Sequence, residues 1–258
     1  MIFIHSFQSE WLKTRRSLAA WLVIIGSFFI PAIMFAVRLV YHEKLQGDSI
    51  APAFWEALFG NCWQTMALLL LPMGVILSTS LIAQLEYRNN TWKQLHTTPQ
   101  YFSTIFLAKF AVIATMMLQF LVLFNIGILL TGFVPHLLFG IALPQQPVPW
   151  GYFLTQNAYF FVDCLPIIAL QYLISLQFKN FLVPLGVGLG IMLASLISLE
   201  WKYCYLMPYT HCSLNFYAIK HIKGAIDPSV NYHAWALGYF VLFMVISFIL
   251  YITQKQKG

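Results

Sequence analysis

The chain has 258 residues, of which 60% are hydrophobic, 17% are aromatic and only 9% carry a charge. A water-soluble globular protein carries about 25% charged residues, so this chain has too few charges to cover a surface that faces water. Apolar helices of about 20 residues allow roughly six membrane crossings in this length and leave no room for a sizeable soluble catalytic domain. The composition therefore predicts an all-α, polytopic membrane protein.

The net charge of +6 comes from Lys and Arg residues scattered in ones and twos between apolar runs. This pattern is typical of the cytoplasmic face of a membrane protein, so we expect no nucleic-acid partner. The four cysteines form no CxxC pair, and we expect neither a metal site nor a redox site from them. No small-residue cleavage site follows the first apolar stretch, which we interpret as a retained anchor.

Charged residues and prolines divide the chain into six predicted spans. The uncharged stretch from Phe110 to Val162 is too long for one span, and the four prolines between residues 135 and 149 predict that it divides in two. Pro72 lies inside the second span, which we expect to be kinked. The spans are predicted at about residues 17–40, 62–83, 104–132, 150–177, 180–199 and 233–252.

The loop charges predict the orientation. Six crossings put both termini on one side, and that side holds nine Lys and Arg residues against five on the other. The nine are Lys13, Arg15, Arg16, Arg88, Lys93, Lys109, Lys179, Lys255 and Lys257. The five are Arg38, Lys44, Lys202, Lys220 and Lys223. The bias places both termini in the cytoplasm, in a multi-pass protein of the plasma membrane.

Residues 1–16 are predicted to form an amphipathic helix on the membrane surface. Apolar side chains recur at helical spacing, and the residues between them are polar or charged. The apolar residues are Phe3, Phe7, Trp11 and Leu12, and the charged ones are Glu10, Lys13, Arg15 and Arg16. The alternative is a basic flank that only sets the topology.

The connection between the second and third spans is the longest polar stretch of the chain. Thr91 is placed to cap a short helix that ends before Pro99. Its side chains fall on two faces, one with Trp92 and Leu95 and one with Lys93 and His96. An amphipathic helix over residues 86–99 is suited to docking on a soluble partner, whereas the alternative is a solvated hairpin loop.

The order Glu86, Thr91, Leu95, Pro99 and Lys109 resembles the pattern of the ABC-2 type permeases, the membrane subunits of ATP-binding-cassette exporters. That pattern has an acidic residue, a Gly-Thr pair, a leucine, a proline and a lysine that enters the next span. Asn90 stands where the family usually has Gly, and Asn also tolerates unusual backbone angles. Six spans behind a surface helix are similar to the family too, and in length the chain resembles members of lantibiotic-immunity and peptide-export systems.

The resemblance implies a permease that works with a separate ABC-type ATPase, two permeases and two ATPases forming the assembly. The permease copies could be identical or related. ATP and Mg would be bound by the ATPase, and this chain has no G-x-x-x-x-G-K-[ST] motif of its own. We therefore expect no catalytic residue, cofactor or metal on this chain. The residues expected to couple it to the ATPase are Glu86, Arg88, Thr91, Trp92, Lys93, Leu95, His96 and Pro99.

Residues 200–232, on the outer side, are rich in aromatic side chains, as is common at the membrane interface. In position and length this segment resembles the short re-entrant helices that ABC-2 permeases carry between their last two spans. An ordinary aromatic belt is the alternative. Cys204 and Cys212 fall in this segment, outside the cytoplasm, and we expect them to lie close enough to form a disulfide.

Asp163 is the only carboxylate near the middle of a predicted span. A charge there is costly and commonly functional, which makes Asp163 a candidate for the substrate pathway. The alternative is a structural Asp that is protonated or hydrogen-bonded to a neighbouring helix. In the fifth span, by contrast, small residues recur every four positions from Gly186 to Ser198, and this predicts close packing against a neighbouring backbone.

The favoured function is export of an amphipathic or hydrophobic substrate, such as a peptide antibiotic or a lipid-like molecule, between two permease copies in the lipid bilayer. A proton-coupled secondary carrier that uses Asp163 is the alternative. A membrane-embedded enzyme is disfavoured, because the seven His residues are predicted at span ends or in loops and no cluster of His, Asp or Glu shares one membrane depth.

Overall fold

The structure is a computed structural model that describes residues 2–88, 101–222 and 230–255. The described part of the chain is helical and contains no strand. Its longer helices are α1 (Ile2–Thr14), α2 (Leu18–Val40), α4 (Phe54–Thr65), α5 (Leu71–Arg88), α7 (Phe102–Leu138), α8 (Trp150–Gln177), α9 (Leu182–Ile197), α10 (His211–Ile219) and α11 (Tyr232–Lys255). Shorter elements are η1 (His42–Lys44), α3 (Leu45–Ile50), the π turn η2 (Met66–Leu70), η3 (Ser198–Glu200) and η4 (Cys204–Leu206).

Six helical segments among the described residues are long and apolar enough to cross a bilayer, which is the predicted number. They are Leu18–Val40, Phe54–Leu85, Phe102–Leu138, Trp150–Gln177, Leu182–Glu200 and Tyr232–Thr253. Large apolar side chains such as Trp21, Leu193 and Val241 are exposed on their outer faces. In water such faces would be unfavourable, but hydrocarbon is their natural solvent. The all-α membrane architecture expected from composition is confirmed.

Two spans are longer in the structure than expected. The second begins at Phe54 rather than near residue 62, and Glu56 lies exposed in the first turn of α4, where a carboxylate is favoured by the helix dipole. The third runs on to Leu138, past the expected end at residue 132. Pro135 lies in its last turn, where the missing proline N–H costs only one hydrogen bond. A proline near a helix end therefore did not break the helix as predicted.

The irregularity in the second span precedes Pro72. The π turn η2 joins α4 to α5 directly in front of this proline. A proline nitrogen cannot donate to the carbonyl four residues earlier, and single π turns are a common way to accommodate such a break inside a helix. The segment from Phe54 to Arg88 thus stays helical throughout while it changes its helical repeat once.

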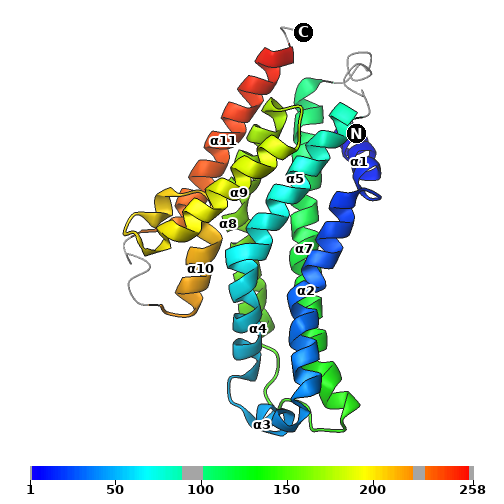
Figure 1. Cartoon of the computed structure of the whole chain (residues 1–258), viewed down its shortest axis with the longest axis vertical. Coiled ribbons are helices and arrows are strands. Elements are labelled where there is room, and N and C mark those ends of the chain that lie inside the picture. The colour runs from blue at the N-terminus through cyan, green and yellow to red at the C-terminus, as the bar shows by residue number, and fades with distance from the viewer. Residues whose placement is uncertain (1, 89–100, 223–229, 256–258) are drawn as a thin grey trace.

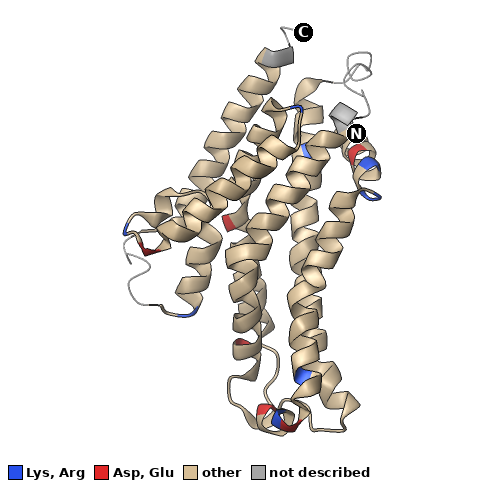
Figure 2. Cartoon of the chain, viewed as in Figure 1, with Lys and Arg blue, Asp and Glu red and all other residues tan. Residues whose placement is uncertain are grey.

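The helices form a bundle in which α2 pairs with α7 along its length and α8 pairs with α11 (Figure 1). Helix α5 lies between these pairs and contacts α2, α8 and α9. Lys, Arg, Asp and Glu gather at the two ends of the bundle and in the loops beside α9 and α10, and they are nearly absent from its middle (Figure 2). This distribution is the one that a hydrocarbon layer around the middle of the bundle requires.

The N-terminal helix α1 packs on α7. Its residues Ser6, Glu10 and Thr14, which are four apart, are buried, while Ile4 and Leu12 are more than half exposed. Lys13 forms an ion pair with Glu10 at 2.5 Å. Phe7 and Trp11 are partly buried and pack against the core. The exposed face of the helix carries both apolar and polar side chains, as is common in helices at a membrane interface. The predicted helix is present, ends at Thr14, and leaves Arg15 and Arg16 in a turn.

Helix α10 enters the bundle from the side. It packs against α4, η2 and α8, and its residues from His211 to Phe216 are all buried. Figure 1 places α10 beside the middle of α8 rather than at either end of the bundle. The segment from Ser198 to Ile219 therefore inserts short helices among the long ones, and α11 begins beside the middle of the bundle rather than at its far end.

The end of the bundle opposite the termini is closed by loop contacts. Arg38 at the end of α2 pairs with Asp48 at 2.8 Å. The Gln145 backbone N–H donates to the Ser49 carbonyl, and the Trp55 indole N–H donates to the carbonyl of Gln146. The start of α1 and the end of α11 both lie toward the other end of the bundle (Figure 1). The α7–α8 loop and the termini thus mark opposite ends of the molecule.

We predict that the end with the termini faces the cytoplasm. A reporter that works only in the cytoplasm should give a signal when it is fused after Gly258 and none when it is inserted near Gln145, because the Lys and Arg bias favours that orientation. Reporter activity is measured in intact cells. The reverse pattern of signals would contradict the assigned orientation, and signal at both sites would contradict the six-span topology.

Candidate functional site

Asp163 lies at the middle of α8 and its side chain is completely buried. Its Oδ1 accepts a hydrogen bond from Nδ1 of His233, in the first turn of α11, at 2.8 Å. Its Oδ2 has no hydrogen-bond partner in the part of the chain that the structure describes. A buried carboxylate with one oxygen unpartnered is costly to keep, which is why such groups commonly mark functional positions.

The sequence did not indicate the partner of Asp163, because all seven His residues were predicted at span ends or in loops. His233 begins the last span and was placed at a span end, but that end lies beside the middle of α8 because residues 198–219 enter the bundle. The imidazole ring stacks on Tyr159, with 4.4 Å between the ring centroids, and lies tilted against Tyr232 at 4.2 Å. These contacts hold the ring so that Nδ1 points toward the carboxylate.

A second buried polar group lies two turns further along α8, at Gln171. Its Nε2 donates to the Ser80 hydroxyl on α5 at 3.1 Å and to the Pro184 carbonyl on α9 at 2.8 Å. Its Oε1 accepts from the Tyr209 hydroxyl at 3.0 Å. One side chain, completely buried, therefore connects α5, α8, α9 and the segment that precedes α10.

Gly188 on α9 makes room for this amide. A Cβ at that position would lie 2.5 Å from Oε1 of Gln171 and 2.9 Å from the Ile76 side chain. The sequence predicted instead that α9 packs through the face that starts at Gly186. A Cβ at Gly186 or Gly190 would meet none of the described residues within 4 Å. The small residue that permits close packing within the chain is Gly188, and the stripe that starts at Gly186 is exposed.

The residues expected to couple the chain to an ATPase fall mostly outside the described residues. Helix α5 carries the positions of Glu86 and Arg88 in its last turn. Thr91, Trp92, Lys93, Leu95, His96 and Pro99 lie in the range 89–100, which the structure does not describe. Lys109, the last residue of the family pattern, is buried in α7. The coupling role of residues 86–99 therefore stays a prediction.

All four cysteines are buried free thiols in the structure. Cys204 lies in η4, where burial raises the pKa of its thiol and keeps the sulfur protonated. The Cys212 Sγ lies 4.0 Å from the carbonyl oxygen of Phe160 on α8. A disulfide between Cys204 and Cys212 stays a prediction that the structure does not contain. Among the described residues no three His, Cys, Asp or Glu side chains come together as metal ligands.

Uncharged polar residues inside apolar helices are the signal that could have found Gln171. The spans were divided by charged residues and prolines, so Ser80, Gln171 and Tyr209 were not considered together. An amide inside a span has few ways to be satisfied in hydrocarbon and usually bonds to another helix. That rule selects Gln171 as a contact residue, although the sequence does not say which helices it joins.

The comparison with known families gives one match. The model of the ABC-2 family of transporter proteins matches residues 6–195, well over half of the chain. No curated protein and no solved structure matches it. The matched range includes most of α1, Asp163, Gln171 and most of α9, and it ends before the segment that contains α10.

We predict that Gln171→Leu lowers the free energy of unfolding by about 2 kcal/mol, because it takes one hydrogen-bond partner away from each of three groups on three different elements. Thermal unfolding of the purified protein in detergent is the measurement. Gln156→Leu is the matched control, since Gln156 lies on the same helix and its Oε1 already has no partner among the described residues. Equal melting temperatures for the two variants would show that the amide of Gln171 stabilises nothing.

We predict that His233→Ala lowers the free energy of unfolding more when Asp163 is present than when Asp163 is replaced. Removing the imidazole leaves the carboxylate wholly unpartnered, which costs about 1–3 kcal/mol, whereas an apolar side chain at position 163 needs no partner. Thermal unfolding of the parent, the two single variants and the double variant with D163L gives the double-mutant cycle. A cycle in which the two changes are additive would mean that the bond between His233 and Asp163 contributes nothing to stability.

Proposed function

Because this chain belongs to the ABC-2 family of transporter proteins, we propose that it is the membrane-spanning permease of an exporter whose energy comes from a separate ABC-type ATPase. The family match over residues 6–195 is the observation that carries this proposal. The described residues form six helices that are apolar enough to cross a bilayer, and the sequence has no Walker A motif. ATP and Mg would therefore be bound by the partner, and the substrate would be moved by this chain.

Helix α5 is the element best placed to carry force from the ATPase into the bundle. The coupling segment, residues 86–99, begins in the last turn of α5, and Ser80 lies eight positions, or about two helical turns, before Arg88. Ser80 bonds to Gln171, which in turn bonds to α9 and to Tyr209. A displacement of the coupling segment along α5 would therefore reach α9 and the segment in front of α10 through buried hydrogen bonds.

A second copy of the permease, identical or related, would complete the pathway. The exposed face of α9 supports this proposal, because Gly186 and Gly190 alternate there with exposed apolar side chains such as Val187 and Leu193. Small residues on a membrane helix let a second helix approach closely. An amphipathic or hydrophobic substrate, such as a peptide antibiotic or a lipid-like molecule, would pass between the two copies.

A proton-coupled carrier that uses Asp163 is the second candidate function. The observation in its favour is the completely buried carboxylate, with His233 on one oxygen and no described partner on the other. His and Asp are groups from which membrane carriers build proton relays. Such a carrier would need no ATPase, and residues 86–99 would have no role in it.

We predict that Trp92→Ala combined with Leu95→Ala releases the ATPase. If residues 86–99 dock as a short helix, these two side chains supply its apolar contact, and loss of an aromatic anchor costs about 2 kcal/mol or more of binding. The double variant should reach the membrane at normal abundance, yet fail to co-purify the ATPase or to stimulate ATP hydrolysis. Charge changes at Arg88 and Lys93 should do less, and their effect should shrink at high salt.

The matched control is Trp201→Ala with Leu206→Ala. It deletes the same two side chains from exposed positions in the segment predicted to lie on the outer side. This control should co-purify the ATPase as the parent does. If the Trp92 and Leu95 variant also binds and stimulates the ATPase normally, residues 86–99 are only a loop and the coupling proposal is wrong.

A further inference from the structure

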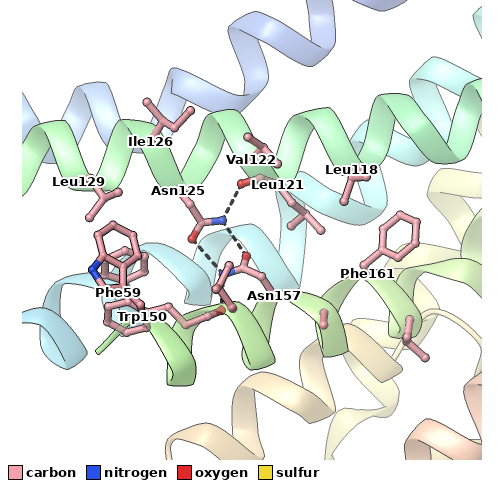
Figure 3. A pocket seen from close by; sticks show the side chains of 14 residues that line it. Phe59, Leu118, Leu121, Val122, Asn125, Ile126, Leu129, Trp150, Asn157 and Phe161 are labelled. Atoms are coloured by element: carbon pink, nitrogen blue, oxygen red, sulfur yellow. Dashed lines mark hydrogen bonds between the residues drawn. The ribbon is translucent and has the colours of Figure 1, made fainter. Parts of the chain in front are cut away.

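A groove of about 510 Å³ runs between α7 and α8 on the surface of the bundle that faces the lipid (Figure 3). Fourteen residues line it, and twelve of them are apolar or aromatic. They are Phe59, Leu118, Leu121, Val122, Asn125, Ile126, Leu129, Trp150, Phe153, Leu154, Asn157, Ala158, Phe161 and Val162. A volume of this size lies within the range of small-molecule binding sites.

The groove is open toward the lipid. Its rims carry side chains that are about half or more exposed, Val122 on α7 and Leu154 and Trp150 on α8. Its floor is closed by Phe59 of α4, which stacks on Phe153 at 3.8 Å between ring centroids. On α8 the lining runs from Trp150 to Val162, which is roughly 18 Å of helix. The groove is therefore elongated, apolar and accessible from the side.

Two amide side chains face each other across the groove, Asn125 from α7 and Asn157 from α8 (Figure 3). The Nδ2 of Asn125 donates to Oδ1 of Asn157 at 2.7 Å, and Nδ2 of Asn157 donates to Oδ1 of Asn125 at 3.1 Å. Each Nδ2 also donates to a carbonyl one turn earlier in its own helix, that of Leu121 or of Phe153.

This network fixes the orientation of both amides and uses all their donors. A backbone carbonyl can only accept, so the nitrogen of each amide has to point at it, and both N–H bonds of each nitrogen are then occupied. Each Oδ1 accepts one hydrogen bond from the described residues and has a second lone pair left. The polar capacity that the amide pair offers a ligand is thus acceptor capacity alone.

We propose that this groove is a binding site for a membrane-dissolved amphiphile that has an alkyl chain and one or two O–H or N–H donors. The alkyl chain lies along the apolar walls, and the donors bond to the free lone pairs of Asn125 and Asn157. A ligand with acceptors only would leave these oxygens unpaired in an apolar site. The site does not depend on the ATPase or on residues 86–99, so it can be tested apart from the proposed function.

The test uses the purified full-length chain in lipid nanodiscs and two photoreactive probes that carry a diazirine in the acyl chain. One probe is a monoacylglycerol with two free hydroxyl groups, and the other is its dimethyl ether. Labelled residues are mapped by mass spectrometry. Because two neutral hydrogen bonds distinguish the probes, the monoacylglycerol should label residues 118–129 and 150–162 about tenfold more than the ether does.

Two variants distinguish the contribution of the amide pair from that of the space in the groove. Asn125→Leu with Asn157→Leu should remove the preference for the hydroxyl probe and leave ether labelling unchanged. Ala158→Phe keeps the amide pair and fills the groove, so it should reduce labelling by both probes. Val245→Phe, on the exposed face of α11, is the control for an added ring on a lipid-facing helix. It should not change labelling of the groove by either probe. Melting temperatures check that every variant is folded.

Equal labelling of the parent protein by the two probes would overturn the proposal, because the groove would then be ordinary lipid-facing surface. Labelling of the parent that shifts to sites outside these two ranges would overturn it as well. Absence of labelling in the groove, together with cross-links from Leu154 to a second polypeptide, would show that a protein helix fills it instead. Since the wild-type comparison needs no variant, the proposal can fail even if both amide replacements unfold the chain.

Discussion

Four separate elements of the chain meet at one buried amide, the side chain of Gln171. In an apolar interior a hydrogen bond is electrostatically stronger than in water, and an unpaired partner is correspondingly costly. Ser80, Pro184 and Tyr209 would each lose a partner if α5, α9 or the segment before α10 moved away from α8 alone. Gly188 adds a steric condition, because only a residue without a side chain lets α9 approach the amide. These elements are therefore expected to move together.

This constraint gives the proposed transport cycle a physical path. Helix α5 connects the predicted docking segment to Gln171 without a break, and Gln171 connects it to α9, whose outer face is exposed and rich in small residues. The hydrogen bond between Asp163 and His233 connects α8 to α11 in the same way, but Oδ2 of Asp163 has no partner among the described residues. In this account the amide transmits force, whereas the carboxylate is the group with capacity left for a substrate or a proton.

Composition and charge spacing were enough to predict six spans and an N-terminal helix, because the hydrocarbon layer imposes length and polarity on every crossing. They failed where the chain departs from simple crossings. His233 was placed at a span end, yet the inserted segment puts that end beside the middle of α8. Asn125 and Gln171 were missed because charged residues and prolines were used as markers and uncharged polar residues were not. The contact that makes Gly188 necessary depends on which helices are neighbours, and a single sequence does not specify that.

We propose that ATP hydrolysis on a separate subunit drives transport through this chain. It is tested most directly in inside-out vesicles that contain the chain with its ABC-type ATPase, by uptake of a fluorescent amphipathic peptide in the presence of an uncoupler. The account predicts uptake that requires ATP and the ATPase and persists when the proton gradient is collapsed. Uptake that needs no ATPase and stops with the uncoupler would contradict it and would assign transport to a proton carrier built on Asp163.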